Sequence, residues 1–322
     1  MDLFTPIIRP ERHHPQFRAL LTSDLHRRAR ARMTDLAARM GDPNGNFIRD
    51  FQGEAFHARV FELACFAYLE EAGLTIDRSH EQPDFIAAYG EHAVAVESVT
   101  VNPVGGQGAD VSLQNIKQLT NVEILDKVSV EVAERITRSL QKKLRHRYHE
   151  LPQCAGNPLV LMISPFFEAG SNFYTDDALF YPLYGGPEGW SNIVTPFFHL
   201  EEAAPISAIL YCNQFTVSRF FRLTTNFSAH GAPRTVRAGY CYRRRGEDEY
   251  ALQQFEHLLG SADLEQETWS EGVTVFENPF AEIPLRRGLL PATSYVSVQD
   301  GFVCREVSDF HPLLSSTVIQ TP

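Results

Sequence analysis

The sequence predicts an α/β protein with one main domain and additional β structure in its C-terminal part. Helical apolar periodicity extends over three segments, residues 16–40, 52–72 and 121–150. Strand-like patterns occupy five short segments, residues 74–76, 84–89, 93–101, 157–164 and 206–212. After about residue 165 the chain is rich in aromatic residues, proline and glycine, and further strand patterns follow. Because helical segments separate groups of strands, this order favours a sheet flanked by helices.

The N-terminal segment, residues 1–46, is expected to be helical. Between residues 16 and 40 apolar side chains recur close to helical spacing, and arginines occupy much of the remaining surface. The sequence GDPNGN at 41–46 consists of turn-forming residue types throughout, which predicts the end of this helix. The segment leads into the predicted core, residues 47–215.

The helix predicted at 52–72 is apolar around most of its circumference, which is typical of a helix buried on more than one side. Three short strands follow it, and the strand at 93–101 alternates small and β-branched residues. The glycine-rich stretch VGGQGAD at 104–110 lacks the GxGxxG spacing, and no helix opens directly on it. These two features argue against a dinucleotide site.

The long helix predicted at 121–150 has two different faces. Its apolar stripe consists of Val132, Ile136, Leu140 and Leu144. Its opposite side carries a basic face that consists of Arg135, Arg138, Lys142 and Arg145. Such a face would follow a phosphate backbone with salt-dependent affinity, and it would equally serve as an ordinary solvated surface.

The runs at 157–164 and 206–212 are largely apolar, which predicts strands buried on both faces. Residues 216–322 are expected to form a β-rich C-terminal extension. No linker-like composition separates this extension from the core, so we expect both to belong to one domain.

The formal net charge of −11 comes from 29 Lys and Arg against 40 Asp and Glu. This balance argues against a general nucleic-acid coat or a membrane-surface protein, because both need broad positive fields. It is compatible with a local basic groove, and all four lysines lie between residues 117 and 143. The longest apolar run is far shorter than the roughly 20 residues of a bilayer span, and the first residues show no secretory pattern. Five scattered cysteines without a CxxC pair favour a cytoplasmic protein.

Three carboxylates occupy predicted core positions, where burying an unpaired carboxylate would lower the stability of the fold. Glu62 lies on the largely apolar helix, Asp84 opens one strand, and Glu97 stands in the middle of a β-branched run. A buried carboxylate is unfavourable unless it is paired or binds a cation. Two adjacent strands that each offer a carboxylate can hold a hard divalent ion, with a helix glutamate completing the shell through water. Such an ion would activate a water molecule and neutralise charge on a phosphate.

These residues resemble the motif of the PD-(D/E)xK nuclease superfamily, which includes many restriction and repair endonucleases. The match consists of Glu62 on the leading helix, Pro83-Asp84, and Glu97 on the next strand, followed by the long helix and a buried strand. The stretches FQGEAFHARVFEL, QPDF and AVESVTVNP are also similar to a group of bacterial proteins built on this plan. The resemblance implies a restriction-endonuclease-like mixed sheet flanked by helices. It also implies a Mg²⁺ or Mn²⁺ ion held by Asp84 and Glu97, with Glu62 holding a metal-bound water.

The chain departs from this motif at one position. In active members of the superfamily a lysine usually stands two residues after the strand glutamate, and here that residue is Val99. In some members the lysine has moved to a neighbouring element. This makes Lys127 and Lys142, on the following helix, the candidate replacements, with Arg138 and Lys142 in contact with phosphate.

We therefore expect a divalent-metal-dependent protein that acts on nucleic-acid phosphodiesters, with impaired catalysis if no lysine replaces Val99. The alternative is a catalytically inactive module of the same fold that binds nucleic acid or protein, with a homodimer as one expected assembly. A third alternative is a different hydrolase seated in the β-rich half. Structural roles also stay open, with Asp84 capping a turn and Glu97 pairing with Arg59 or Arg135.

Overall fold

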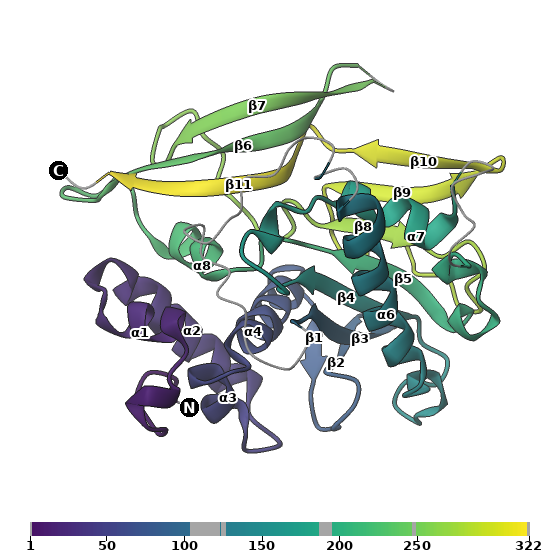
Figure 1. Cartoon of the computed structure of the whole chain (residues 1–322), viewed down its shortest axis with the longest axis horizontal. Coiled ribbons are helices and arrows are strands. Elements are labelled where there is room, and N and C mark those ends of the chain that lie inside the picture. The colour runs from purple at the N-terminus through teal and green to yellow at the C-terminus, as the bar shows by residue number, and fades with distance from the viewer. Residues whose placement is uncertain (1, 104–122, 124–126, 187–194, 247–248, 321–322) are drawn as a thin grey trace.

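The computed structural model of the chain describes residues 2–103, 123, 127–186, 195–246 and 249–320 (Figure 1). These residues form a mixed α/β structure, in which helices flank a large mixed sheet and a smaller sheet lies beside it. The predicted α/β class is confirmed at this level.

The main sheet has eight strands in the order β1-β2-β3-β4-β5-β8-β9-β10. Its strands are β1 (Thr75–Asp77), β2 (Phe85–Tyr89), β3 (His92–Val101), β4 (Leu159–Pro165), β5 (Ile206–Tyr211), β8 (Thr274–Glu277), β9 (Ser294–Gln299) and β10 (Phe302–Val307). Strands β3, β4 and β5 run parallel to one another, as do β8 and β9, and the other neighbours are antiparallel. Strands β4 and β5 are buried along their whole length, as their largely apolar sequences predict.

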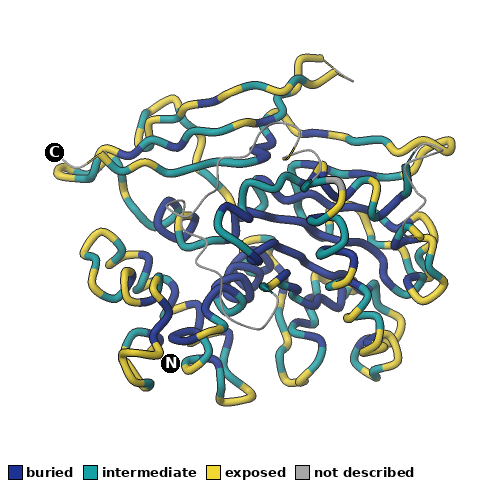
Figure 2. Tube along the Cα trace, viewed as in Figure 1, coloured by how far each residue is buried: buried dark blue, intermediate teal, exposed yellow. Residues whose placement is uncertain are grey.

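Helices cover both faces of this sheet. On one face α4 (Phe56–Glu71) shares a hydrophobic core with Val94 and Val96 of β3. On the other face α6 (Ala133–Leu144) shares a second core with Ala95 and Val99 of the same strand. Since successive strand residues point to opposite faces, the alternation of β3 assigns its side chains to these two cores. Figure 2 shows the buried layer running through the central strands and α4, whereas α6 is buried only on the side that faces the sheet.

The remaining helical elements are shorter. The α-helices are α1 (Pro15–Thr22), α2 (Arg27–Met40), α3 (Phe47–Gln52), α7 (Phe180–Tyr184) and α8 (Val217–Thr224). A π-helical stretch, Lys127–Val132, precedes α6. The 3₁₀ turns are Pro10–Arg12, Asp24–His26, Tyr148–Glu150, Ser171–Phe173, Asp176–Leu179, Phe197–His199 and Glu201–Ala203.

A second sheet has the order β11-β6-β7 and consists of β6 (Arg234–Arg244), β7 (Tyr250–Leu258) and β11 (Phe310–Gln320). It lies above α8 and the N-terminal helices in Figure 1. Its inner side reaches α8 through buried ion pairs, because Arg237 of β6 and Arg222 of α8 both contact Glu267.

The boundaries of the predicted helices differ from the observed ones. The segment 16–40 breaks at Ser23, because Arg30 turns back and donates to the carbonyls of Leu20 and Ser23, which closes α1. The helix predicted at 52–72 begins later, at Phe56, because the preceding helix α3 ends at Gln52 and Gly53 follows it. The α-helical part of 121–150 ends at Leu144. The glycine-rich stretch at 104–110, and residues 121, 122 and 124–126 of the predicted long helix, lie outside the described residues.

Strands from both sides of residue 215 belong to the main sheet, since β8, β9 and β10 continue it beyond β5. A division into 47–215 and 216–322 therefore runs through one sheet. In the described part of the chain, no helix is both long and apolar enough to cross a bilayer.

Candidate functional site

The antiparallel pair β2 and β3 brings two of the predicted carboxylates together. Phe85 is opposite Val96, so Asp84, one residue earlier, lies beside Glu97. The Asp84 amide donates to Glu97 Oε2 at 3.0 Å, and the Ser98 amide donates to Asp84 Oδ2 at 2.7 Å. The Ser98 hydroxyl also donates to Asp84. These reciprocal bonds fix both carboxylates where β2 begins, and Asp84 bridges two strands instead of only capping a turn.

A lysine from α6 reaches this pair. Lys143 Nζ lies 2.5 Å from Glu97 Oε1, and the Tyr148 hydroxyl donates to the same oxygen at 2.9 Å. The two lysines predicted for this role lie elsewhere: Lys127 Nζ pairs with Glu168 Oε2 at 2.6 Å, and Lys142 is exposed. The sequence interpretation therefore missed the lysine that contacts Glu97.

The spacing of Lys143 from the apolar residues of α6 predicts which face of the helix carries it. Leu140 and Ile136 are buried against the sheet, and Lys143 follows them by three and seven residues. Residues three, four and seven apart share one side of a helix, so Lys143 lies on the edge of the apolar stripe. Lys142 is rotated by about 100° from it, which points its side chain to solvent.

Glu62 approaches from α4 and already has two cationic partners. Its Oε1 lies 2.6 Å from Arg78, and its Oε2 lies 2.7 Å from Arg59. Arg59 also pairs with Asp50 at 2.6 Å. The expectation that Arg59 or Arg135 pairs with Glu97 is wrong, because Lys143 takes that position and Arg59 holds Glu62.

The three carboxylates influence one another electrostatically. Burial and the charge of Asp84 raise the pKa of Glu97 from 4.5 to about 7, although Lys143 and Tyr148 oppose the rise. Burial and the same Asp84 charge also raise the pKa of Glu62, against the effect of Arg78 and Arg59. Both shifts come first from burial and second from the neighbouring Asp84 charge, so a cation added beside these carboxylates would favour their ionised forms.

The geometry limits which residues would hold a metal ion. Among the residues that the structure describes, no three His, Cys, Asp or Glu side chains are arranged to bind one. The predicted ligand set of Glu62, Asp84 and Glu97 is thus not assembled, because two arginines occupy Glu62. Asp84 and Glu97 alone still fit Mg²⁺, which keeps several waters and is usually bound by one or two carboxylates together with substrate phosphates.

The basic face predicted on α6 is partly neutralised. Val132, Ile136 and Leu140 are buried as predicted, so the basic residues do point away from the sheet. Two of them nevertheless pair with glutamates one turn earlier. The pairs are Arg135 with Glu131 at 3.0 Å and Arg138 with Glu134 at 2.7 Å. Lys142 and Arg145 remain exposed, which leaves two basic groups for a phosphate backbone.

In comparisons with protein families, curated proteins and solved structures, no family model, protein or structure matches this chain. The candidate site therefore stands on its own geometry.

Proposed function

We propose that this chain is a divalent-metal-dependent, nuclease-like protein with a restriction-endonuclease-like core, and that it acts on nucleic-acid phosphodiesters. The proposal rests on one contact: the ammonium of Lys143 lies 2.5 Å from the carboxylate of Glu97, which is itself hydrogen-bonded to the Asp84 amide. The element order α4, β1, β2, β3, α6, β4 supports it, since the resemblance to PD-(D/E)xK nucleases implies this order.

Lys143 compensates for the valine in the motif. Glu97 and Val99 are two residues apart on β3, so they point to the same face. Val99 packs in the core beneath α6, where it is 3% exposed. A lysine at that position would be buried under the helix, whereas Lys143 brings its ammonium to Glu97 from the helix itself.

Each side chain then has a defined role. Asp84 and Glu97 would hold Mg²⁺ or Mn²⁺, which supplies an activated water and neutralises phosphate charge when bound. Lys143 holds Glu97 and presents its ammonium where it would orient the water and stabilise negative charge on a phosphate oxygen. Tyr148 fixes the Glu97 carboxylate from the same side. Because the pKa of Glu97 is about 7, metal binding competes with its proton and strengthens as the pH rises.

Isothermal titration with MgCl₂ or MnCl₂ at pH 8 tests the metal site without relying on catalysis. We expect binding to wild type and its loss in Asp84→Ala, while Asp77→Ala, an exposed aspartate on β1, binds as wild type does. Cleavage of single- and double-stranded DNA and RNA is then assayed with the same proteins. Absence of both cleavage and an Asp84-dependent metal signal would refute the proposal.

A second candidate is a catalytically inactive module of this fold that binds nucleic acid or protein. The observation that favours it is the pairing within the cluster, where Arg59 and Arg78 occupy Glu62 and Lys143 occupies Glu97. This candidate predicts salt-sensitive binding that needs no metal and survives Glu97→Gln. Metal-dependent cleavage by wild type would exclude it.

A further inference from the structure

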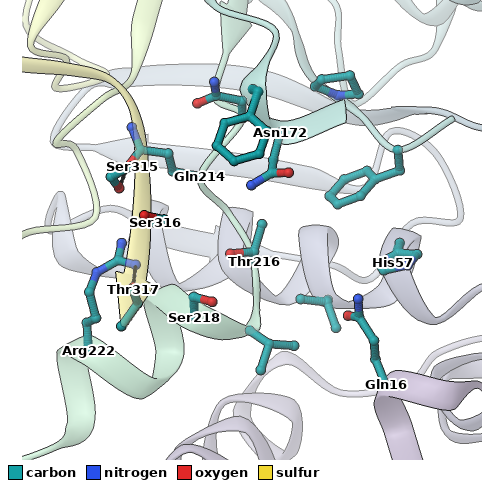
Figure 3. A pocket seen from close by; sticks show the side chains of 16 residues that line it. Gln16, His57, Asn172, Gln214, Thr216, Ser218, Arg222, Ser315, Ser316 and Thr317 are labelled. Carbon is teal, nitrogen blue, oxygen red and sulfur yellow. Dashed lines mark hydrogen bonds between the residues drawn. The ribbon is translucent and has the colours of Figure 1, made fainter. Parts of the chain in front are cut away.

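A polar pocket of about 220 Å³ lies at the edge of the sheet where the parallel strands end. It receives Pro165 and Phe166 from the end of β4, and Asn213 and Gln214 from the end of β5. Other walls come from α1, α4, α8 and β11 (Figure 3). Ligands of open α/β sheets bind in crevices outside the carboxyl ends of strands, which is the position of this pocket.

The lining combines hydrogen-bonding groups with apolar surface. Asn172 and Thr216 point toward one another across the pocket, and Ser218 lies beside them (Figure 3). Among the described residues, no hydrogen-bond partner contacts these three side chains, so their donors and acceptors are open to a ligand. The apolar part of the lining consists of Val60, Pro165, Phe166, Phe173 and Val217.

The pocket favours an uncharged ligand. Among the described residues that line it, only Arg222 is permanently charged, and its guanidinium binds both carboxylate oxygens of Glu267 at 2.7 Å. Its remaining nitrogen donates to Thr317 at 2.9 Å. Because this arginine is already neutralised and bonded, a charged ligand group would enter the pocket without a counter-charge, which is costly.

The pocket and the carboxylates share two structural elements. Helix α4 contributes His57 and Val60 to the pocket and Glu62 to the carboxylate cluster. Five residues separate His57 from Glu62, which is about 8 Å along the helix axis. At the sheet edge, the Phe166 amide donates to the carbonyl of Val101 at 2.8 Å, which joins the pocket wall to the end of β3. The pocket and the carboxylates are therefore connected through α4 and through the end of β3.

We propose that this pocket takes one unpaired nucleobase of the nucleic-acid strand whose phosphodiester lies at Asp84 and Glu97; the inference rests on the proposed function. A base is neutral and planar, and its edge offers donors and acceptors together, which matches an amide and two hydroxyls between apolar walls. The volume is below the roughly 300–1,000 Å³ typical of drug-sized ligands, which suits a single base. Proteins that read an extruded base use this combination of edge hydrogen bonds and apolar contacts.

The test uses uncharged nucleosides, titrated one at a time and followed by ligand-observed NMR, with ribose as a sugar control. Asp84→Ala, Asn172→Ala and Thr216→Val are compared with wild type. We expect one nucleoside to be preferred, and Asn172→Ala to weaken its binding by about 5- to 150-fold, the range for losing a bidentate base contact. Asp84→Ala is expected to bind it as wild type does. Absence of nucleoside binding, equal competition by ribose, or binding unaffected by both pocket substitutions would overturn the inference.

Oligonucleotide cleavage separates this inference from the proposed function. If both hold, Asn172→Ala still cleaves but loses preference for the base that it bound as a nucleoside. If nucleosides bind in an Asn172-dependent way but no metal binding or cleavage is found, the proposed function fails and the pocket assignment to a base stands. If cleavage occurs and its base preference is unchanged in Asn172→Ala, the pocket assignment fails alone. Unchanged thermal unfolding of Asn172→Ala, whose side chain is only half-buried, serves as the folding control.

Discussion

Replacement of Glu97 by glutamine is expected to stabilise the protein at alkaline pH. In the folded chain Glu97 keeps its proton up to about pH 7, whereas its ordinary pKa is 4.5. Between these values the folded state binds more protons than the unfolded state, so stability falls as the pH rises. The stability is fully present below pH 4.5 and is lost as the pH passes through about 7.

The size of the effect follows from the pKa. A rise from 4.5 to about 7 corresponds to about 3 kcal/mol of unfolding free energy, at about 1.4 kcal/mol for each tenfold change in proton affinity. Glutamine retains one oxygen for Lys143 and Tyr148, but its amide group cannot accept the Asp84 amide, which costs about 1 kcal/mol. We therefore expect Glu97→Gln to be more stable than wild type by about 2 kcal/mol at pH 8, and slightly less stable at pH 5.

Urea unfolding of both proteins at pH 5, 6, 7 and 8 measures this difference. Glu91→Gln makes the same chemical change at an exposed position before β3 and is expected to follow the wild-type pH dependence. If the wild-type and Glu97→Gln stabilities run parallel from pH 5 to pH 8, then Glu97 does not titrate near neutrality and the electrostatic account of the cluster is refuted.

Three further substitutions and one matched control test the site and its surroundings. Lys143→Met should lower the free energy of unfolding by about 2 kcal/mol at pH 8, with little change at pH 5, because it leaves Glu97 without its cation. If the chain is a nuclease, the same substitution should lower its cleavage rate at least about 100-fold. Lys142→Met, the matched control on exposed surface, should change stability by less than about 0.5 kcal/mol. Val99→Lys should destabilise the chain by about 2–4 kcal/mol in urea unfolding without increasing cleavage, because it places a charge in the core under α6; a gain in cleavage would contradict the role given to Lys143. Asp176→Ala should cost about 2–3 kcal/mol, because the buried Arg305 loses one of its two carboxylate partners and keeps Asp177 at 3.1 Å, and a loss below about 1 kcal/mol would show that the pair with Asp176 contributes little.

The parts of the site that follow from local pattern could be predicted from the sequence. Strand alternation and the cost of a buried carboxylate were sufficient to select Asp84 and Glu97, which the structure brings together. Helix phase also contained the signal for Lys143, because Leu140 precedes it by three residues. Position along the chain alone does not distinguish Lys142 from Lys143, whereas helix face does.

The parts that depend on long-range contact could not be predicted. Arg78 follows β1 and contacts Glu62 only after α4 has packed on the sheet. The spacing of the two residues in the sequence therefore does not predict their ion pair. Glu131 and Glu134, by contrast, were visible one turn before Arg135 and Arg138, and i to i+4 pairing predicts their neutralising effect. The pairing of β8 with β5 joins segments that are far apart in sequence, and local periodicity carries no information about it.

The strand order of the main sheet has a consequence for synthesis of the chain on the ribosome. β5 pairs on one side with β4, which has already been made, and on the other with β8, which begins only at Thr274. At about 5–20 residues per second, translation of residues 212–273 takes about 3–12 s. During this interval the nascent chain carries an uncovered edge strand of largely apolar sequence, the kind of edge that recruits other chains. We therefore expect newly made copies of this protein to be exposed to association through β5 until β8 has been synthesised.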